Sequence, residues 1–187
     1  MLIVFTGNGK GKTTAALGQA VRIVGRGKSV LMIQFIKGPW KSGEDYVEMH
    51  RKSFDFAQGE SRTVKHGERF EIRKRGLGFV GILGDQLPRE EHARAAREAF
   101  AEAVREVEGG VWGAVVLDEV NVAVSLGLLG VAEVLAPFKM LSPEQLVIFT
   151  GRDAPQEFLE RADLATEMRE IKHPFNDGNM AKIAIEF

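Results

Sequence analysis

A glycine- and lysine-rich string near the amino terminus has the residue types that bind phosphate groups. The string is GNGKGKTT, Gly7 to Thr14, and it follows an apolar run, Leu2 to Thr6, and precedes a stretch with helical spacing of apolar residues. Backbone N–H groups of a glycine loop can approach phosphate oxygens where no Cβ intervenes, and a following helix adds the positive end of its dipole. In this arrangement Lys12 would reach the phosphates and the Thr13 hydroxyl would ligate Mg²⁺.

The string resembles a P-loop but departs from the strict pattern. That pattern has glycine five residues before Gly11, where this chain has Thr6, and the first glycine comes one place later at Gly7. A glycine turn that contains lysines by chance is the alternative. The strand-like run before the string and the helical pattern after it favour the phosphate site.

A second candidate group stands at the end of another apolar run. Asp118 and Glu119 follow Val111 to Leu117, which is where P-loop proteins keep the carboxylate that holds Mg²⁺ or its water shell. A solvated strand end is the alternative for this pair. Because Mg²⁺ prefers hard oxygen ligands, Thr13, Asp118 and a bound nucleotide would together suit it.

The elements that must position these groups alternate between two patterns. Strands are expected at Leu2–Thr6, Ser29–Ile36, Val111–Leu117, Leu146–Thr150 and Ile183–Phe187; helices are expected from about Ala16 to Gly25, over Pro88–Glu108 and over Asp153–Leu164. This alternation predicts an α/β protein with one domain over residues 1–187. We expect a three-layer P-loop NTPase (RecA-like) fold, with a mainly parallel sheet covered by helices and ligands at the carboxyl ends of its strands. The second strand is expected to lie beside the first.

Composition excludes several classes of protein. The 187 residues carry a net charge of −1 and include no cysteine, which excludes disulfides, Fe–S clusters and cysteine nucleophiles. The longest charge-free stretch of the hydrophobic middle, Val120 to Ala132, has 13 residues, fewer than the roughly 18 of a membrane span. No signal peptide is recognisable at the start. We therefore expect a cytoplasmic protein that binds neither nucleic acid nor membrane.

A basic segment and the histidines have less specific patterns. Residues Arg51 to Arg75 include eight basic and four acidic side chains, which predicts a solvated segment or hairpin; the alternative is a lip that attracts an anionic ligand. Gly76 to Gly84 is predicted to be a loop with apolar side chains. The histidines lack metal-binding spacing and are expected at the surface or at helix caps: His50, His66, His92 and His173.

Several strings together resemble one family, the P-loop ATP:corrinoid adenosyltransferases of cobalamin biosynthesis. In order, they are VFTGNGKGKTTAALG, IQFIKGPWKSGE, LDEVNVAVSLGLL, FTGRDAPQEFLERADLATEMREIKHPF and the closing IEF. The likeness covers nearly the whole chain. Its most specific parts are the variant glycine loop and the late block that ends in KHPF, which ordinary P-loop ATPases lack.

The resemblance implies transfer of the 5′-deoxyadenosyl group from ATP to Co(I) of a reduced corrinoid, with triphosphate as the leaving group. The acceptor would be cobyrinic acid a,c-diamide, cobinamide or cobalamin. It also implies a homodimer and an electron donor, such as a flavoprotein, that reduces Co(II). Its ATP-binding residues would be Gly7, Asn8, Gly9, Lys10, Gly11, Lys12, Thr13, Thr14 and Arg152. Lys12, Thr13, Asp118 and Glu119 would be catalytic, and the last three would hold Mg²⁺. A surface role is the alternative for Arg152.

The corrinoid side is where this chain departs from the family. Many members carry a GEGFTWET-like string whose aromatic side chains pack on the corrin ring, and the matching stretch here is GLGFVGILGD. Phe79 is kept and would bind the corrinoid, but Gly81 stands in place of the tryptophan. Whether Phe79 acts alone or with Phe70 or Ile82 stays open, as does a packing role for Phe79. Trp40 either lines the site or packs in the core.

Two other functions remain possible on this sequence. One is a P-loop ATPase or kinase that acts at the γ-phosphate, and the other is a nucleotide-dependent switch that binds a partner. The identity of the products separates all three.

Overall fold

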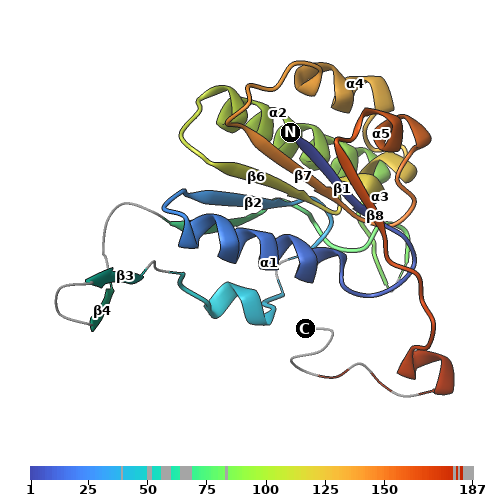
Figure 1. Cartoon of the computed structure of the whole chain (residues 1–187). Coiled ribbons are helices and arrows are strands. Elements are labelled where there is room, and N and C mark those ends of the chain that lie inside the picture. Colours follow the sequence, from blue (N-terminus) through green and yellow to red (C-terminus); the bar gives the residue numbers. More distant parts are fainter. Residues whose placement is uncertain are drawn as a thin grey trace.

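The computed structural model describes residues 1–38, 40–49, 52–55, 60–63, 69–82, 84–178, 180 and 182, and a parallel sheet lies at its centre (Figure 1). The sheet has six strands in the order β5-β2-β6-β7-β1-β8, each parallel to its neighbours. The strands are β1 (Leu2–Thr6), β2 (Val30–Gln34), β5 (Phe70–Lys74), β6 (Ala114–Asp118), β7 (Leu146–Thr150) and β8 (Leu164–Glu167). The predicted α/β class and parallel sheet are confirmed.

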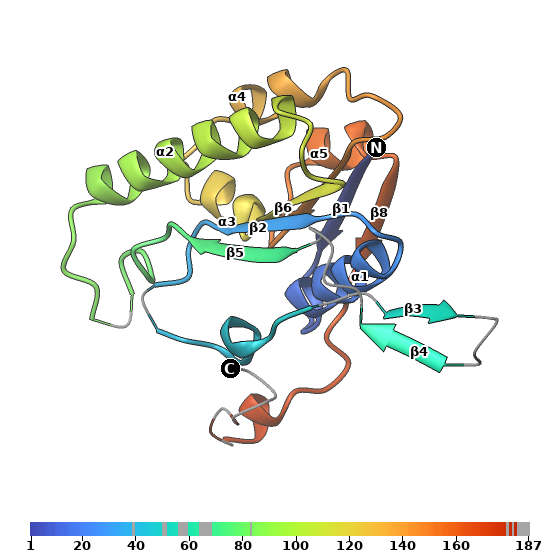
Figure 2. The same ribbon diagram turned by 90° about the vertical axis from the view of Figure 1, so that its left-hand side faces the viewer.

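Helices cover both faces of the sheet, so the protein has three layers. One face carries α1 (Lys12–Gly25) and the other carries α2 (Arg89–Glu108), α3 (Val120–Ser125), α4 (Val131–Leu135) and α5 (Gln156–Arg161) (Figures 1 and 2). Side chains alternate between the two layers along each strand. In β1, for example, Leu2 and Val4 pack on the α2 side whereas Ile3 and Phe5 pack on the α1 side. No helix formed by the described residues is long and apolar enough to cross a membrane.

The prediction that the second strand lies beside the first is wrong. Strand β2 is parallel to β1, but β6 and β7 lie between them. Burial separates the central strands from the edge strands: β1, β2 and β6 consist of buried residues throughout and β7 nearly so, whereas β5 is only half-buried and β8 is exposed. The most apolar strands occupy the centre of a helix-covered sheet and the more polar ones form its edges.

The end of the late helix also differs from the prediction. Helix α5 ends at Arg161, and Leu164 begins β8 instead of ending the helix. The backbone N–H of Leu2 donates to Asp163 Oδ2 at 2.6 Å, and the N–H of Asp163 donates to the Leu2 carbonyl. These bonds to β1 turn the chain into the sheet edge. The predicted strand at the carboxyl terminus, Ile183–Phe187, lies outside the described residues.

The basic segment forms a hairpin and then an edge strand. Strands β3 (Lys52–Asp55) and β4 (Glu60–Thr63) pair antiparallel, which agrees with the predicted hairpin, and β5 joins the main sheet (Figure 2). Arg73 and Arg75 form ion pairs with Glu102 of α2, at 2.9 and 2.6 Å. The basic side chains of β5 and Arg75 are thus neutralised by this chain's own carboxylates, which disfavours the anion-attracting lip for this part of the segment.

The described part of Gly76–Gly84 is a loop, as predicted.

The predicted surface or helix-cap position of His92 is wrong. His92 on α2 is only 4% exposed, and its Nε2 lies 3.1 Å from Asp85 Oδ2. Asp85 also accepts the backbone N–H groups of Gly81 and Leu87. Because the Asp85 carboxylate satisfies its ring, His92 can be buried, and the contact fastens the loop to α2. His50 and His66 lie outside the described residues.

Candidate functional site

The glycine string forms the connection between β1 and α1, as the sequence predicts. Helix α1 begins at Lys12, after Gly11 in the left-handed region at φ 115°. The Lys12 side chain turns back over the loop, and its Nζ donates to the carbonyls of Gly7 and Gly9 at 2.8 and 2.7 Å. Burial lowers the pKa of Lys12, and the charge of Glu119 opposes that shift. The loop therefore holds a largely buried ammonium group close to the first turn of a helix.

Glycine is required in this loop for a reason that the motif did not indicate. A Cβ on Gly7 or Gly9 would come within 2.5 or 2.7 Å of the Met168 carbonyl oxygen, in the segment after β8. The N–H of Gly9 donates to that same carbonyl at 2.6 Å. The late segment thus supports the loop from behind, and a side chain at either glycine would push the two apart.

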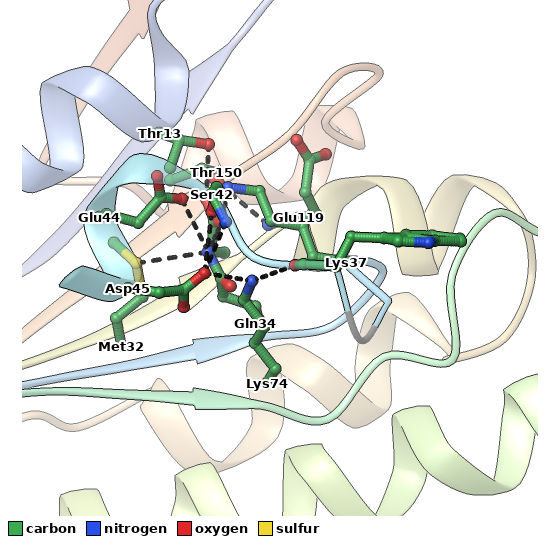
Figure 3. Close-up of polar contacts among 12 residues, drawn as sticks. Thr13, Met32, Gln34, Lys37, Ser42, Glu44, Asp45, Lys74, Glu119 and Thr150 are labelled. Carbon is green, nitrogen blue, oxygen red and sulfur yellow. Dashed lines mark hydrogen bonds and ion pairs between the residues drawn. The ribbon is translucent and has the colours of Figure 1, made fainter. Parts of the chain in front are cut away.

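Asp118, at the carboxyl end of β6, is the centre of a buried polar network. Its partners Thr13, Gln34 and Thr150 are labelled in Figure 3. Its Oδ1 accepts the hydroxyl groups of Thr13 and Thr150 at 2.9 and 2.7 Å, and its Oδ2 accepts Gln34 Nε2 at 3.1 Å. The side chain is fully buried. A buried carboxylate is tolerated only when its oxygens are satisfied in this way. The network ties α1 to the ends of β2, β6 and β7.

Lys37 and Glu44 extend this network towards solvent. Lys37 Nζ lies 2.7 Å from Glu44 Oε1 and 3.7 Å from Asp118 Oδ2. Burial by itself raises the pKa of Glu44, but the hydrogen bond and charge of Lys37 outweigh it and lower that pKa to about 2. Burial acts downward on Lys37, and the neighbouring carboxylates, Asp118 foremost, raise its pKa overall. This pair thus places a fixed cation and a fixed anion beside Asp118.

Glu119 lies next to this network in an unusual backbone conformation. Its φ is 67°, rare for a residue with a side chain, and its N–H donates to Thr150 Oγ1 at 2.9 Å. Burial, followed by the charge of Asp118, raises the pKa of Glu119 to about 7. The strained turn keeps this carboxyl group close to Lys12 and Arg152, whose charges oppose the shift. Such strain is often found at functional sites.

A pocket of about 990 Å³ gathers most of the predicted residues. Its lining includes Asn8, Gly9, Lys10, Gly11, Lys12, Thr13, Thr14, Phe79, Glu119 and Arg152. Gly7 and Asp118 are not part of the lining: Gly7 lies against Met168, and Asp118 is buried beneath Thr13. A second cavity, of about 680 Å³, lies at the amino ends of the strands and contains none of the predicted residues.

The pocket also contains Lys37 and Glu44, for which the family resemblance predicted a place in the lining and no further role, and late residues to which the sequence assigned no role. Lys37 and Glu44 lie in one family-like string, and Glu170, His173 and Asn176 lie in the late block that resembles the family. Asn176 Nδ2 donates to Glu170 Oε1 at 2.7 Å. The resemblance of these two strings to the family was the signal that could have indicated these residues. The residue types in the strings did not indicate which side chains face the pocket.

The donor set fits a magnesium ion held together with a nucleotide. Thr13 and Asp118 offer oxygen atoms 2.9 Å apart. Gln34 Oε1, on the amide that contacts Asp118, is buried with no hydrogen-bond partner among the described residues and could accept from a metal-bound water. No cluster of three or more His, Cys, Asp or Glu that could hold a metal occurs in the described part of the chain. Mg²⁺ is commonly held by one or two protein oxygens plus phosphate and water.

The aromatic residues beside the pocket settle two open questions of position. Phe79 is 47% exposed and Trp40 is 64% exposed, so neither is a core residue. Phe70 begins β5 opposite Val30, at the amino end of the strands, and packs on the α1 side of the sheet. It therefore does not join Phe79. Ile82 is 59% exposed on the same loop as Phe79.

Fold and site together define the class of this protein: a P-loop α/β protein, with the glycine loop after the first strand and an acidic residue at the end of a nearby parallel strand. The family model for "ATP:corrinoid adenosyltransferase BtuR/CobO/CobP" matches residues 1–187. The chain belongs to this family.

Known relatives agree with the family match over the whole chain. The corrinoid adenosyltransferase of Escherichia coli K12 is 37% identical over 187 residues, which are 100% of this chain and 85% of the relative. Corrinoid adenosyltransferase CobA of Salmonella typhimurium is 34% identical over the same shares of the two chains. The corrinoid adenosyltransferase of Pseudomonas aeruginosa is 34% identical, over 100% of this chain and 83% of the relative.

Proposed function

We propose that this protein transfers the 5′-deoxyadenosyl group of ATP to Co(I) of a reduced corrinoid and releases triphosphate. The observation that carries this proposal is that one pocket contains both the phosphate-binding loop and Phe79. The acceptor is a corrinoid such as cobyrinic acid a,c-diamide, cobinamide or cobalamin. Family membership over the whole chain supports the same reaction.

The residues of the pocket suit a reaction at carbon. The cobalt electron pair forms the Co–C5′ bond while the C5′–O5′ bond breaks, and its electron pair leaves with the triphosphate. Co(I) carries no proton, so the reaction needs no general base at the nucleophile. What the protein must supply is positive charge around the leaving group, and Lys12, Lys10, Arg152 and the loop N–H groups provide it.

Mg²⁺ would be held by Thr13, Asp118 and Glu119 and would neutralise part of the triphosphate charge. Thr13 presents its hydroxyl at the first turn of α1, where the helix dipole also favours an anion. Asp118 keeps that hydroxyl oriented through the hydrogen bond of 2.9 Å. These residues therefore bind and position the leaving group rather than transfer protons.

We further infer that the whole chain is one domain, because a single sheet joins segments from residue 2 to residue 167. The remaining expectations of the sequence stay proposals: a homodimer, a cytoplasmic site of action, a flavoprotein-like electron donor for Co(II), and no partner among nucleic acids.

Product identity tests the proposed reaction. With Mg-ATP and a chemically reduced corrinoid under anaerobic conditions, we expect a light-sensitive alkylated corrinoid and inorganic triphosphate in equal amounts. Release of ADP and phosphate would instead indicate an ATPase or kinase that acts at the γ-phosphate. No turnover, together with nucleotide-dependent binding of a partner protein, would indicate a switch.

Metal-dependent nucleotide binding is expected to strengthen as pH rises from about 6 to 8. The pKa of Glu119 is raised to about 7, so below that pH its carboxyl group is mostly protonated and must lose a proton before it can assist a cation. Well below pH 7 the affinity should change by up to roughly tenfold per pH unit. Calorimetric titration of Mg-ATP in buffers with different ionisation enthalpies measures both the affinity and the protons released.

Glu119→Gln is the matched control for this pH dependence. ATP itself titrates in the same pH range, but it contributes equally in both proteins. The difference between wild type and variant in the slope of Mg-ATP affinity against pH is therefore due to Glu119. The variant should bind Mg-ATP with a flatter pH profile and release fewer protons. Identical profiles for the two proteins would show that Glu119 does not titrate on binding.

A further inference from the structure

Trp40 and Phe79 form an exposed aromatic pair beside the nucleotide pocket. Their ring centroids are 6.1 Å apart and their planes are inclined by 33°. Trp40 comes from the segment after β2 and Phe79 from the loop after β5, so two connections that are distant in sequence bring the rings together. Phe79 also lines the pocket, which makes the pair continuous with the nucleotide site.

The Trp40 indole rests on backbone that has no side chains. A Cβ on Gly38 would lie 2.6 Å from Trp40 Cζ3, and a Cβ on Gly78 would lie 3.2 Å from Trp40 Cη2. The ring therefore occupies the space that side chains at these glycines would need. Even so, 64% of the surface of Trp40 stays exposed. Packing against the glycines positions the indole without burying it.

Polar contacts fix the segment that carries Trp40. Lys74 Nζ donates to the Trp40 carbonyl oxygen and to Asp45 Oδ2, each at 2.5 Å. Asp45 Oδ2 also accepts the N–H of Ser42 at 2.7 Å. The strand β5 thus holds the backbone of Trp40 in place through Lys74. An exposed indole held at its backbone and along its ring loses little conformational freedom when a ligand stacks on it.

The Phe79 loop contributes no second ring beside Phe79. At Gly81 the chain has φ 69°, and a Cβ built there meets no atom within 4 Å. Phe79 is thus the one aromatic residue that this loop, over its described residues 76–82 and 84–87, contributes. The ring that contacts Phe79 is that of Trp40, from the segment after β2.

We propose that Trp40 is the second aromatic residue of the acceptor-binding face and, with Phe79, stacks on the corrin macrocycle. The inference rests on the proposed function. A broad and largely apolar macrocycle can cover both rings at once, and it has to approach the nucleotide pocket that the same pair borders. Aromatic stacking adds affinity beyond that of the apolar area buried. Trp40 is then a positioning residue for the acceptor and does not contact the triphosphate.

Binding of cob(II)alamin to the protein saturated with Mg-ATP, without a reductant, tests this role in the absence of turnover. We expect Trp40→Leu to weaken cob(II)alamin binding by about tenfold and to leave the Kd of Mg-ATP unchanged. Trp40→Phe keeps a ring and should lose less. Gly38→Ala should act in the same direction as Trp40→Leu, because its Cβ displaces the indole without removing it.

Met140→Ala is the matched control, since Met140 is 91% exposed but belongs to neither the pocket nor the aromatic pair. Its cob(II)alamin affinity should equal that of the wild type. Unchanged cob(II)alamin binding by Trp40→Leu overturns the inference, as does an equal loss of Mg-ATP affinity, which would assign Trp40 to the nucleotide side. A wild-type protein that binds no cob(II)alamin also overturns it.

Failure of the proposed function gives a different pattern. The wild type would then bind cob(II)alamin, and Trp40→Leu would weaken that binding, yet no alkylated corrinoid would form after reduction. That outcome supports the acceptor-binding face and removes the proposed reaction. Binding and product formation are measured separately, so each result bears on one of the two claims.

Discussion

Replacing Lys12 by alanine is expected to lower the rate of adenosyl transfer by at least about a hundredfold. Lys12 is 8% exposed and lies at the start of α1, where the loop N–H groups and the helix dipole also favour an anion. As the C–O bond breaks, negative charge grows on the oxygen that leaves with the triphosphate. A charge stabilised in a site with little water is worth more than one at the surface, and a hundredfold loss corresponds to about 2.7 kcal/mol.

Lys10→Ala is the comparison variant for Lys12. Lys10 lies in the same loop and lines the same pocket, but its side chain is exposed, so solvent screens its charge. Its loss should cost clearly less than the loss of Lys12. Single-turnover rates with preformed Co(I) measure the chemical step directly for both variants.

Loss of Lys12 also removes the hydrogen bonds to the carbonyls of Gly7 and Gly9, so the loop itself has to be checked. The thermal midpoint of unfolding and the Kd of Mg-ATP separate a distorted loop from a missing charge. Lys12→Ala with a normal midpoint and a near-normal single-turnover rate would contradict the role given to Lys12.

The motifs and most elements could be predicted because they depend on residues close in sequence. The apolar run of β1, the glycine string and the helical spacing of α1 follow one another directly, and each pattern has a local physical cause. The same holds for Asp118 at the end of a buried strand. Residues of this kind predicted the phosphate site, and the structure places most of them in the lining of one pocket.

The order of the strands could not be predicted, because it depends on pairing between distant segments. The pattern of Val30–Gln34 records burial on both faces, and that burial is the same whether β1 or β6 is the neighbour. Strand β8 has four exposed residues and no apolar alternation, so only its bonds to β1 define it. Strand β5 includes the charged residues Glu71, Arg73 and Lys74, so its sequence also lacks the apolar pattern that would predict a strand.

The lining of the pocket and its surroundings were only partly predictable. His173 and Asn176 face it because the segment after β8 passes behind the glycine loop, and Met168 fixes that course through its bond to Gly9. Lys74 donates a hydrogen bond to the Trp40 carbonyl oxygen and so holds the Trp40 backbone where its ring contacts Phe79. Neither placement follows from a local pattern, since both depend on contacts between residues more than thirty positions apart.

Replacing Asp118 is expected to lower the transfer rate as strongly as replacing Lys12, by at least about a hundredfold. Asp118 orients the Thr13 hydroxyl, and its charge would help to hold Mg²⁺ near the triphosphate. Alanine has a second effect: it leaves the hydroxyl groups of Thr13 and Thr150 and the amide of Gln34 without their acceptor. Each buried donor left unpaired costs roughly 1–3 kcal/mol, so Asp118→Ala is expected to unfold at a lower temperature.

Asp118→Asn separates the charge from the fold. In the wild type the hydroxyl groups of Thr13 and Thr150 both donate to Asp118 Oδ1, and the side-chain oxygen of asparagine can accept the same two hydrogen bonds. Its NH₂ group would then face Gln34, whose Oε1 has no partner among the described residues and can turn to accept it. We therefore expect Asp118→Asn to keep most of the stability of the wild type while it loses the activity.

The concentration of Mg²⁺ needed for half-maximal activity is the decisive measurement for Asp118→Asn. If the carboxylate acts through the metal, that concentration should rise together with the fall in rate, and the Kd of ATP without metal should change little. A variant that unfolds like the wild type and works at a near-normal rate in low Mg²⁺ would show that Asp118 serves the fold alone. Thr13 would then have to orient its hydroxyl without help from a charge, in a network that the structure centres on Asp118.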